Sequence, residues 1–528
     1  MNDSKRLQIF LFYFLLAVYI LNGLLAIQRN SVTSDELDHL SYGTRMLKGR
    51  PEKVIPYEDA STMPISALNA LPRAVEQVLH PGLKKTDGGV SDVMHGRYVS
   101  LLICLLAAIF VYRWSKEMFG AMGGLFSLFL FVFCPNLQAN IILVGTDAYA
   151  MLFVLTSAYY FRAFILKSGW KNFILFSSQL ALAQISKQSL VLLFFFFAAS
   201  AIMVLLHRGT LFSRLRINLT RLLVLITITI FVINLSFLFH GTGKPLHAYQ
   251  FSSATFLSLQ QIPVLNRLPF PLPAPFLEGF DQVKHMINLG SGNLKVSARS
   301  YLFGEYFTGN SVWYYYSMVI LFKTPLTVLA LLAVMLWRYM RNPLSKQKIL
   351  TIGYPLALAF FFWFIISFFN RSQHSIRHLL MIYPLMYICM GDVTNLVWKG
   401  KRIWLALVLL YGMATYYFYF PNLIAYTNEL IPDKKNVYRI FASSNIDHGQ
   451  CGYYLREFME KNKEVKWAPA DPHSGDFIIG INDYLDLKQT GKYEWLRRYR
   501  PSGHVHHCYL RFTVSEKDLR QDKQMISE

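Results

Sequence analysis

Apolar runs long enough to cross a lipid bilayer recur along this sequence. The first of them, residues 7–27, has about the length of one helical crossing. Hydrophobic residues make up 54% of the 528 residues and charged residues 16%, whereas a soluble domain carries about 25% charged residues. The sequence therefore predicts a multi-pass α-helical membrane protein with about eleven crossings. We expect them at residues 7–27, 98–113, 121–137, 145–166, 172–187, 189–206, 222–239, 316–337, 349–369, 377–395 and 402–420.

Basic residues gather in short clusters between these runs and give the chain a formal net charge of +21. If the N-terminus is cytoplasmic, every cytoplasmic connection is basic, as membrane insertion favours. The same charge suits partners with phosphate headgroups and membrane lipids. Because apolar runs separate the clusters, we do not expect a nucleic-acid partner. The clusters contain Arg113, Lys116, Lys167, Lys171, Arg208, Arg214, Arg216, Arg221, Arg338, Arg341, Lys346, Lys348, Lys399, Lys401 and Arg402.

The N-terminus has one feature of a secretory signal peptide, because Lys5 and Arg6 precede the first apolar run. That run is longer than a signal h-region, and no small-x-small cleavage site follows it. We therefore expect a retained first helix. The N-terminus is then cytoplasmic and the C-terminus extracytoplasmic.

Three long segments then lie outside the membrane: residues 28–97, 240–315 and 421–528. We divide the chain into a transmembrane domain, residues 1–420 with the first two segments, and a small extracytoplasmic α+β domain, residues 421–528. In the latter, 477–481 and 508–514 are predicted strands and 453–461 a predicted helix. The proline-rich run 263–275 predicts an irregular loop on the membrane surface. Cys451 and Cys508 would be able to pair if this side is oxidising.

Two acids, Asp35 and Glu36, follow the first apolar run directly. A helix that begins near Ser34 places Asp35 and His39 four residues apart, on one face. Ionisable groups at a membrane surface are costly to hold in a partly dry site and are candidates for chemistry. Their spacing has a structural interpretation too, because Thr33 and Glu36 fit a capping box.

A second acid, Asp147, stands at the outer end of the fourth crossing, and cations occur on the same side. A lone interfacial lysine usually extends its amine to water, but a cluster of basic groups suits a lipid-linked phosphate. The two acids suggest one shared cavity. The basic and titratable candidates are Arg97, Lys187, Lys323, Arg371, His374, Arg377 and His378.

The run from His504 to Cys508 contains three histidines. Adjacent residues of a strand point to opposite faces, so two or three ligands at most converge there. We favour a surface strand over a metal site.

Several motifs together resemble the dolichyl-phosphate-mannose protein mannosyltransferase superfamily. It includes bacterial glycosyltransferase family 39 members and the aminoarabinose transferase of lipid A. The motifs follow in family order over nearly the whole chain, and their conjunction is more specific than any one of them. They are Asp35–Leu40, Cys134–Asn140, Gly145–Asp147, Gln184–Ser189, Trp313–Tyr316, Lys323–Leu326, Ile376–Pro384, Ala425–Leu430 and Ser444–Gln450.

Two positions depart from the pattern. Residues 61–65 stand where many bacterial members have a His-Pro-Pro element, so donor or acceptor recognition differs from theirs. His448 stands where the pattern has tryptophan.

The resemblance implies a GT-C fold and an inverting glycosyltransferase with a polyprenyl-phosphate-linked sugar as donor. Asp35 would be the base that deprotonates the acceptor hydroxyl, and Glu36 would orient Asp35 or contact the acceptor. Asp147 would hold a sugar or acceptor hydroxyl. Lys187, Arg377 and Lys323 would neutralise phosphate charge, so that neither metal nor cofactor is required. His39, Arg97, Arg371 and His378 are further substrate-binding candidates.

Three other classes of function remain as alternatives. A lipid-linked glycan transporter would use the acids for gating, but acids are almost absent from the middle of the crossings. An O-antigen ligase or polymerase would use larger lipid-linked donors. A non-catalytic receptor would not need the acid pair. We expect a bacterial inner membrane, and the acceptor is a protein, a lipid or a glycan.

Overall fold

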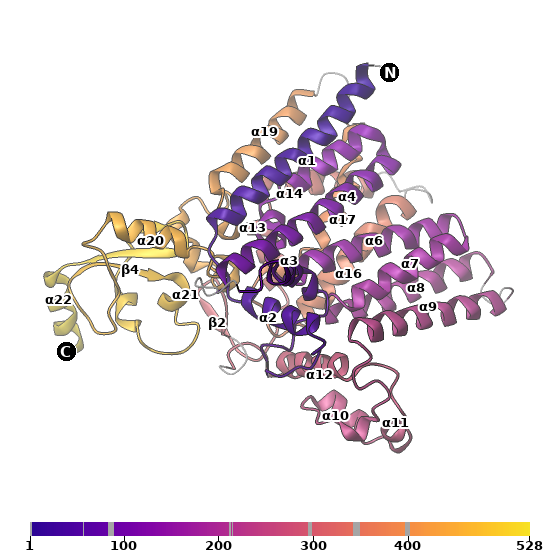
Figure 1. Cartoon of the computed structure of the whole chain (residues 1–528). Helices are drawn as coiled ribbons and strands as arrows, with labels where there is room; N and C mark the ends of the chain where they lie inside the picture. Colours follow the sequence, from indigo (N-terminus) through magenta and orange to yellow (C-terminus); the bar gives the residue numbers. More distant parts are fainter. Residues whose placement is uncertain are drawn as a thin grey trace.

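The computed structural model describes residues 3–55, 57–82, 89–210, 213, 215–293, 298–341, 349–396 and 402–527. Its long helices form one bundle, and a small domain with a sheet lies to one side of it (Figure 1). Arg214, Lys346, Lys348, Lys399 and Lys401, expected in cytoplasmic connections, lie outside the described residues.

Six helices in the described part of the chain are long and apolar enough to cross a membrane, and a bent pair makes a seventh candidate. The predicted class of multi-pass helical membrane protein is therefore confirmed, but the count of about eleven is not. The six begin with α1 (Asp3–Arg29), α4 (Val90–Val132) and α6 (Asp147–Leu166). They continue with η1 and α8 (Gln188–Val191, Leu192–His207), α9 (Leu215–Ser236), and α16 (Tyr354–Phe369) with the end of the preceding η3 (Ile349–Gly353).

The predicted crossing 98–113 and most of the next, 121–137, belong to the single element α4, which ends at Val132. Gly120 interrupts it with a left-handed φ of 79°, which glycine adopts without strain. Three further predicted spans hold α7 (Trp170–Gln184), α17 (Ile382–Met390) and α19 (Arg402–Tyr419), of 15, 9 and 18 residues. These are shorter than the roughly 20 residues of a typical crossing.

The bent pair consists of α13 (Tyr315–Lys323) and α14 (Leu326–Arg341), which meet at 113°. Pro325 lacks a backbone donor and disfavours helical geometry at the preceding residue, so the helix breaks there. Asn428 fills the break, because its Nδ2 donates to the carbonyls of Leu321 and Thr324 at 2.6 and 2.8 Å. The chain after α19 therefore supplies the hydrogen-bond donor that these two carbonyls lack at the break.

The outer segments carry short helices and one hairpin. Gly43 lets α2 approach α3 closely, because a Cβ there would lie 2.3 Å from the Ser66 carbonyl oxygen. The prediction of an irregular loop at 263–275 is wrong at both ends of this run, because α11 begins at Pro263 and α12 begins at Ala274. Proline is tolerated in a first turn because no donor is needed there. The elements are α2 (Glu36–Leu47), α3 (Ser66–Leu79), η2 (Leu246–Ala248), α10 (Ala254–Gln260), α11 (Pro263–Arg267), α12 (Ala274–Leu289), β1 (Ser300–Leu302) and β2 (Glu305–Phe307).

The C-terminal region contains a four-stranded sheet in the order β3-β4-β6-β5, in which β3 is parallel to β4 and the other pairs are antiparallel. The two predicted strands and the predicted helix are confirmed as β4, β6 and α20. Cys451 and Cys508 form a disulfide. The elements are α20 (Gly452–Lys461), β3 (Lys466–Trp467), β4 (Gly475–Gly480), α21 (Ile481–Tyr484), η8 (Glu494–Arg498), β5 (Gly503–Val505), β6 (Tyr509–Val514) and α22 (Glu516–Ser527).

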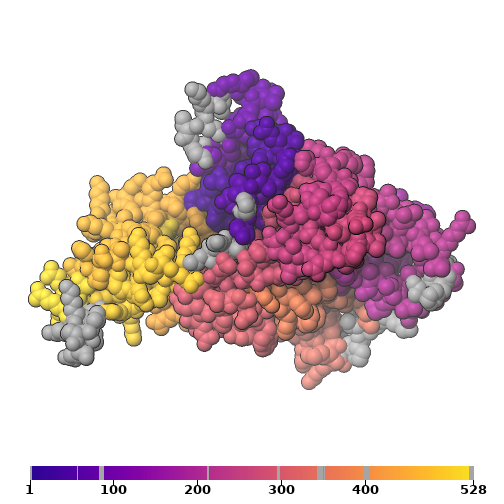
Figure 2. Space-filling model, turned by 90° about the horizontal axis from the view of Figure 1, so that it is seen from below, coloured from indigo at the N-terminus to yellow at the C-terminus, as the bar shows by residue number. Residues whose placement is uncertain are grey.

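The chain before this sheet packs against the first outer segment. Ser31 N donates to the Gln450 carbonyl at 3.0 Å, and Ser34 N donates to the His448 carbonyl at 3.1 Å. Figure 2 shows the first outer segment, the second and the C-terminal region next to one another on one face. The boundary at residue 420 stays a prediction. The remaining short elements are α5 (Pro135–Ile141), η4 (Ile376–Leu379), α18 (Val393–Leu396), η5 (Leu423–Ala425), η6 (Lys434–Arg439) and η7 (Ser443–Asn445).

Candidate active site

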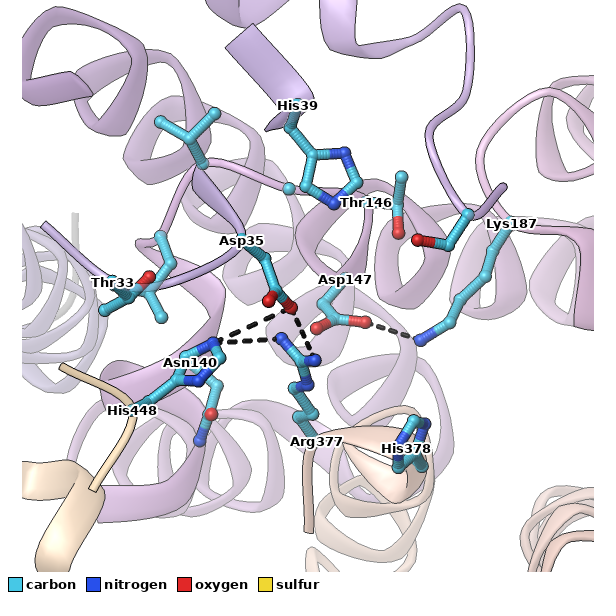
Figure 3. Close-up of a pocket in the computed structure, with 14 residues that line it drawn as sticks. Thr33, Asp35, His39, Asn140, Thr146, Asp147, Lys187, Arg377, His378 and His448 are labelled. Carbon is cyan, nitrogen blue, oxygen red and sulfur yellow. Dashed lines mark hydrogen bonds and ion pairs between the residues drawn. The ribbon is translucent and has the colours of Figure 1, made fainter. Parts of the chain in front are cut away.

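A cavity of about 150 Å³ lies where α2, α5, α6, η1 and η4 meet. We name it the inner cavity. Five segments far apart in the sequence supply its ionisable groups, and Figure 3 shows these side chains converging. Its lining residues are Thr33, Asp35, His39, Ser61, Asn140, Leu143, Val144, Gly145, Thr146, Asp147, Lys187, Arg377, His378 and His448.

Asp35 and Arg377 form the first ion pair of the inner cavity. Arg377 Nη2 lies 2.6 Å from Asp35 Oδ2, and the two side chains remain 26% and 40% exposed. Burial raises the pKa of Asp35, but the charge and hydrogen bond of Arg377, together with His448 and His39, outweigh burial and hold that pKa well below its usual range. Asp35 is therefore an ionised carboxylate with access to the cavity.

Asp147 and Lys187 form the second ion pair, with Lys187 Nζ 2.6 Å from Asp147 Oδ1. Asp147 is the first residue of α6, and Lys187 precedes η1. Figure 3 shows Arg377 between the two carboxylates, with Lys187 on the far side of Asp147. The cavity thus holds two cations and two acids side by side.

His448 joins the first pair from the C-terminal region. Arg377 Nη1 lies 3.2 Å from His448 Nε2, and a guanidinium can only donate, so this nitrogen accepts. His448 Nδ1 then carries the hydrogen and lies 3.1 Å from Ser34 Oγ and 3.2 Å from Ser444 Oγ. Burial and Arg377 lower the pKa of His448 to about 4, so the ring is neutral near pH 7.

A second cavity of about 450 Å³ adjoins the first, and we name it the outer cavity. Asp35, His39, Ser61, Arg377, His378 and His448 line both. The outer cavity adds hydroxyl groups and two acids, Asp38 and Glu58, to its wall. Burial and then Glu58 raise the pKa of Asp38 to about 6. Asp35 and Arg377 therefore stand at the junction of the two cavities.

Glu36 and Arg97, both expected at the substrate, lie elsewhere. They form an ion pair at 2.5 Å in which each side chain is 1% exposed. Glu36 also accepts from Thr33 N and Val144 N, while Arg97 donates to the carbonyls of Asn30 and Ser31. Neither residue lines the inner or the outer cavity. The capping interpretation of Glu36 is the one that this geometry supports.

Lys323 and Arg371 also lie away from the cavities. Lys323 is 1% exposed, and its Nζ donates to the carbonyls of Ile424, Tyr426 and Asn445. Its amine therefore binds the chain after α19, and it lines neither the inner nor the outer cavity. Arg371 is exposed and points to the Asn288 carbonyl at 3.4 Å.

Three histidines expected near the substrate line the cavities. His39 and His378 line both, and His374 lines the outer one. Burial lowers the pKa of His39 to about 4, and burial with Lys187 lowers that of His378 to about 3. Near pH 7 these rings are neutral hydrogen-bonding groups.

Sequence reasoning missed several polar groups of the site: Thr33, Ser61, Asn140, Thr146 and His448. Asn140 and Thr146 belong to motifs that carried the family resemblance, so the motifs would have allowed both to be predicted as site residues. His448 was noted only as a departure from tryptophan. Its contact with Asp35 depends on backbone hydrogen bonds between residues 31–34 and 448–450, and no local sequence pattern predicts these bonds.

Comparison with known proteins gives one family match. Residues 89–237 match the family described as dolichyl-phosphate-mannose-protein mannosyltransferase. The chain resembles this family. The resemblance expected from the motifs is thus confirmed over α4 to α9, a segment that includes Asp147 and Lys187 but not Asp35, Arg377 or His448. No curated protein sequence matches the chain.

Solved structures share similarity at low sequence identity. ArnT from Cupriavidus metallidurans bound to undecaprenyl phosphate is 11% identical, with 94% of this chain and 97% of that chain covered and a TM-score of 0.49. The Archaeoglobus fulgidus oligosaccharyltransferase in the apo form is 12% identical, with 77% and 54% covered and a TM-score of 0.42.

Proposed function

We propose that this protein is an integral-membrane glycosyltransferase that moves a sugar from a polyprenyl-phosphate donor to an acceptor hydroxyl. The observation that carries the proposal is the Asp35–Arg377 pair at the junction of the inner and outer cavities. The match of residues 89–237 to a mannosyltransferase family supports the same class of reaction.

On the donor side, Arg377 and Lys187 supply two cations to the inner cavity. A sugar phosphodiester carries one negative charge, and the phosphate that leaves gains another as the bond to the sugar breaks. Fixed cations stabilise charge that develops in a transition state because they need no reorganisation at that moment. The step can therefore run on the chain's own cations, without a metal.

On the acceptor side, Asp35 is the base. It is ionised, it faces both cavities, and it would take the proton from the acceptor hydroxyl as that oxygen attacks the anomeric carbon. One displacement inverts the anomeric configuration. A base of this kind typically contributes about a hundred- to ten-thousand-fold to the rate. Asp147 and Asn140 provide acceptors and donors for sugar hydroxyls in the inner cavity.

The site faces the extracytoplasmic side of the membrane. The Cys451–Cys508 disulfide supports this orientation, because disulfides persist in oxidising compartments and this disulfide lies close to His448 in the sequence. The basic connections Lys167–Lys171 and Arg208–Arg221 then lie in the cytoplasm, and a bacterial inner membrane fits this arrangement.

The test is transfer from a panel of radiolabelled polyprenyl-phosphate sugars into protein, lipid and glycan fractions of membranes. Wild type is compared with Asp35→Asn and with Glu457→Gln, a matched acid-to-amide change at an exposed residue of α20. We expect label in one fraction with wild type and Glu457→Gln, and loss with Asp35→Asn.

Two results would contradict the proposal. Normal transfer by Asp35→Asn would remove Asp35 as base. No transfer from any single-sugar donor by correctly folded wild type, together with movement of lipid-linked glycan across vesicles, would favour a transporter.

A further inference from the structure

Four side chains form a closed ring of hydrogen bonds at the junction of the cavities. Arg377 lies 2.6 Å from Asp35 Oδ2 through Nη2, and 3.2 Å from His448 Nε2 through Nη1. His448 Nδ1 lies 3.1 Å from Ser34 Oγ, and Ser34 donates to Asp35 Oδ1 at 3.2 Å. Both carboxylate oxygens and both imidazole nitrogens therefore have a partner in the ring.

The ring fixes which imidazole nitrogen is free of hydrogen. Because Arg377 can only donate, His448 Nε2 holds a lone pair and Nδ1 carries the hydrogen. The same Nε2 lies 3.7 Å from Asp35 Oδ2. The Arg377 guanidinium thus donates both to Asp35 Oδ2 and to the lone pair of His448 Nε2.

A donor phosphate competes with Asp35 for this arginine. Arg377 lines the inner cavity, where the proposed function puts the phosphate, and guanidinium matches phosphate oxygens in geometry and charge. When Arg377 turns to the phosphate, Asp35 loses its strongest stabilising partner and becomes a better base. His448 Nε2, whose lone pair is then free, lies 3.7 Å from Asp35 Oδ2.

We propose that His448 is a relay residue, which takes from Asp35 the proton that Asp35 has removed from the acceptor hydroxyl. The inference rests on the proposed function. The acceptor O–H bond breaks as its oxygen bonds to the anomeric carbon, and the anomeric carbon–oxygen bond to phosphate breaks with its electron pair leaving on the phosphate. The proton passes from Asp35 Oδ2 to His448 Nε2 and leaves to water in the outer cavity, which both residues line.

The charges around His448 act in opposite directions on its protonation. Burial and Arg377 disfavour the imidazolium, while Asp35, Glu36 and Asp147 favour it. His39, His374 and His378, which line the same outer cavity, are neutral near pH 7. A donor phosphate that binds Arg377 neutralises the main charge that opposes protonation of His448. The His448 imidazole therefore accepts a proton more readily when the donor is bound.

The test measures kcat and donor KM against pH for wild type, His448→Gln, His448→Ala and the control His247→Gln. His247 is an exposed histidine of η2, outside both cavities. Glutamine keeps an oxygen that can accept from Arg377 but takes no proton at neutral pH. We expect His448→Gln to lower kcat about ten- to a hundred-fold with donor KM within about twofold, a share of the effect of general base catalysis.

Two further readouts separate a relay from a structural role. In wild type, the acid limb of kcat, which reports the donor complex, should lie at higher pH than that of kcat/KM, which reports the free enzyme. Added imidazole should restore part of the rate of His448→Ala, because it fills the space and takes the proton. Control variant His247→Gln should match wild type.

Three outcomes would overturn the inference. Wild-type kcat and pH profile in His448→Gln would leave His448 without a role in proton transfer. A rise in donor KM alone, without imidazole rescue of His448→Ala, would reduce it to a residue that only holds Arg377. Absence of transfer by wild type from every donor would remove the proposed function and the relay with it, whereas the first two results leave that function standing.

Discussion

Asp35 and Glu36 are neighbours in the sequence, and each pairs with an arginine, but the structure uses them in opposite ways. The Glu36–Arg97 pair is 1% exposed on both sides and receives further backbone hydrogen bonds. The Asp35–Arg377 pair keeps 40% and 26% of its side-chain surface and lines two cavities. The same chemical pair is a structural clamp in one place and a candidate reactive group in the other.

The two carboxylates differ in whether their oxygens and their arginine partner are accessible to a ligand. Both Glu36 oxygens are occupied by donors that are themselves fixed by the fold, since two are backbone amides and the third is an arginine that donates to backbone carbonyls. Asp35 is held by two side chains, Ser34 and Arg377, and lines two cavities. An ion pair becomes available for chemistry when one of its partners has another charge to bind.

The strongest way to break this comparison is Asp35→Asn. We expect kcat to fall about a hundred- to ten-thousand-fold, the usual contribution of a general base. Thermal stability should change little, because a partly exposed pair contributes about 0–1 kcal/mol. Transfer assays and Tm of the purified protein check this together. A large fall in Tm would show that Asp35 is structural, like its neighbour.

The converse change is Glu36→Gln, which leaves Arg97 charged and buried without its counter-ion. We expect a loss of about 3–5 kcal/mol in the free energy of unfolding, as for other broken buried pairs. Denaturant unfolding of the reconstituted protein measures it. The matched control is the double variant with Arg97→Gln, which should lose less than the two single variants summed. Full additivity would argue that the two charges do not interact.

Lys187→Gln sharpens the comparison on the donor side. Loss of one charge-assisted hydrogen bond to phosphate is worth about 1.5–3 kcal/mol, so kcat/KM should fall about ten- to a hundred-fold, with part of the fall in kcat because the phosphate gains charge in the transition state. Steady-state kinetics with varied donor check it, and Lys461→Gln on the exposed face of α20 is the control. An unchanged kcat/KM would mean that Lys187 serves only Asp147.

Part of this site could be predicted from the sequence, because the signals are local. Apolar length located the spans, and the four-residue spacing of Asp35 and His39 placed both on one helix face, where they line one cavity. Asp147 and Lys187 flank apolar runs at the same membrane surface and do meet. Each of these conclusions needed only helix geometry and the position of a run's end.

The rest could not be predicted because it depends on contacts between distant segments. His448 reaches Asp35 through pairing of residues 31–34 with 448–450. Lys323 turns to the carbonyls of Ile424 and Tyr426 because the chain after α19 returns across the break at Pro325. Lys187 and Lys323 each stand at the end of an apolar run, but one faces a cavity and the other binds backbone carbonyls, and sequence position alone does not separate them.

The smallest effect concerns Asp38, an acid of the outer cavity without an ion-pair partner among the described residues. Burial and Glu58 raise its pKa to about 6, above an unfolded value of about 3.9. The folded state therefore binds this proton more tightly, and stability falls as pH rises from about 4 to about 6, with the loss complete above that. Asp38→Asn removes the loss, so Tm should rise by about 1 °C at pH 7.5 and not at pH 4. The effect is small because water reaches this carboxyl and screens it. An equal shift of Tm at both pH values would assign it to packing, and Asp38 would then resemble Glu36 more than Asp35.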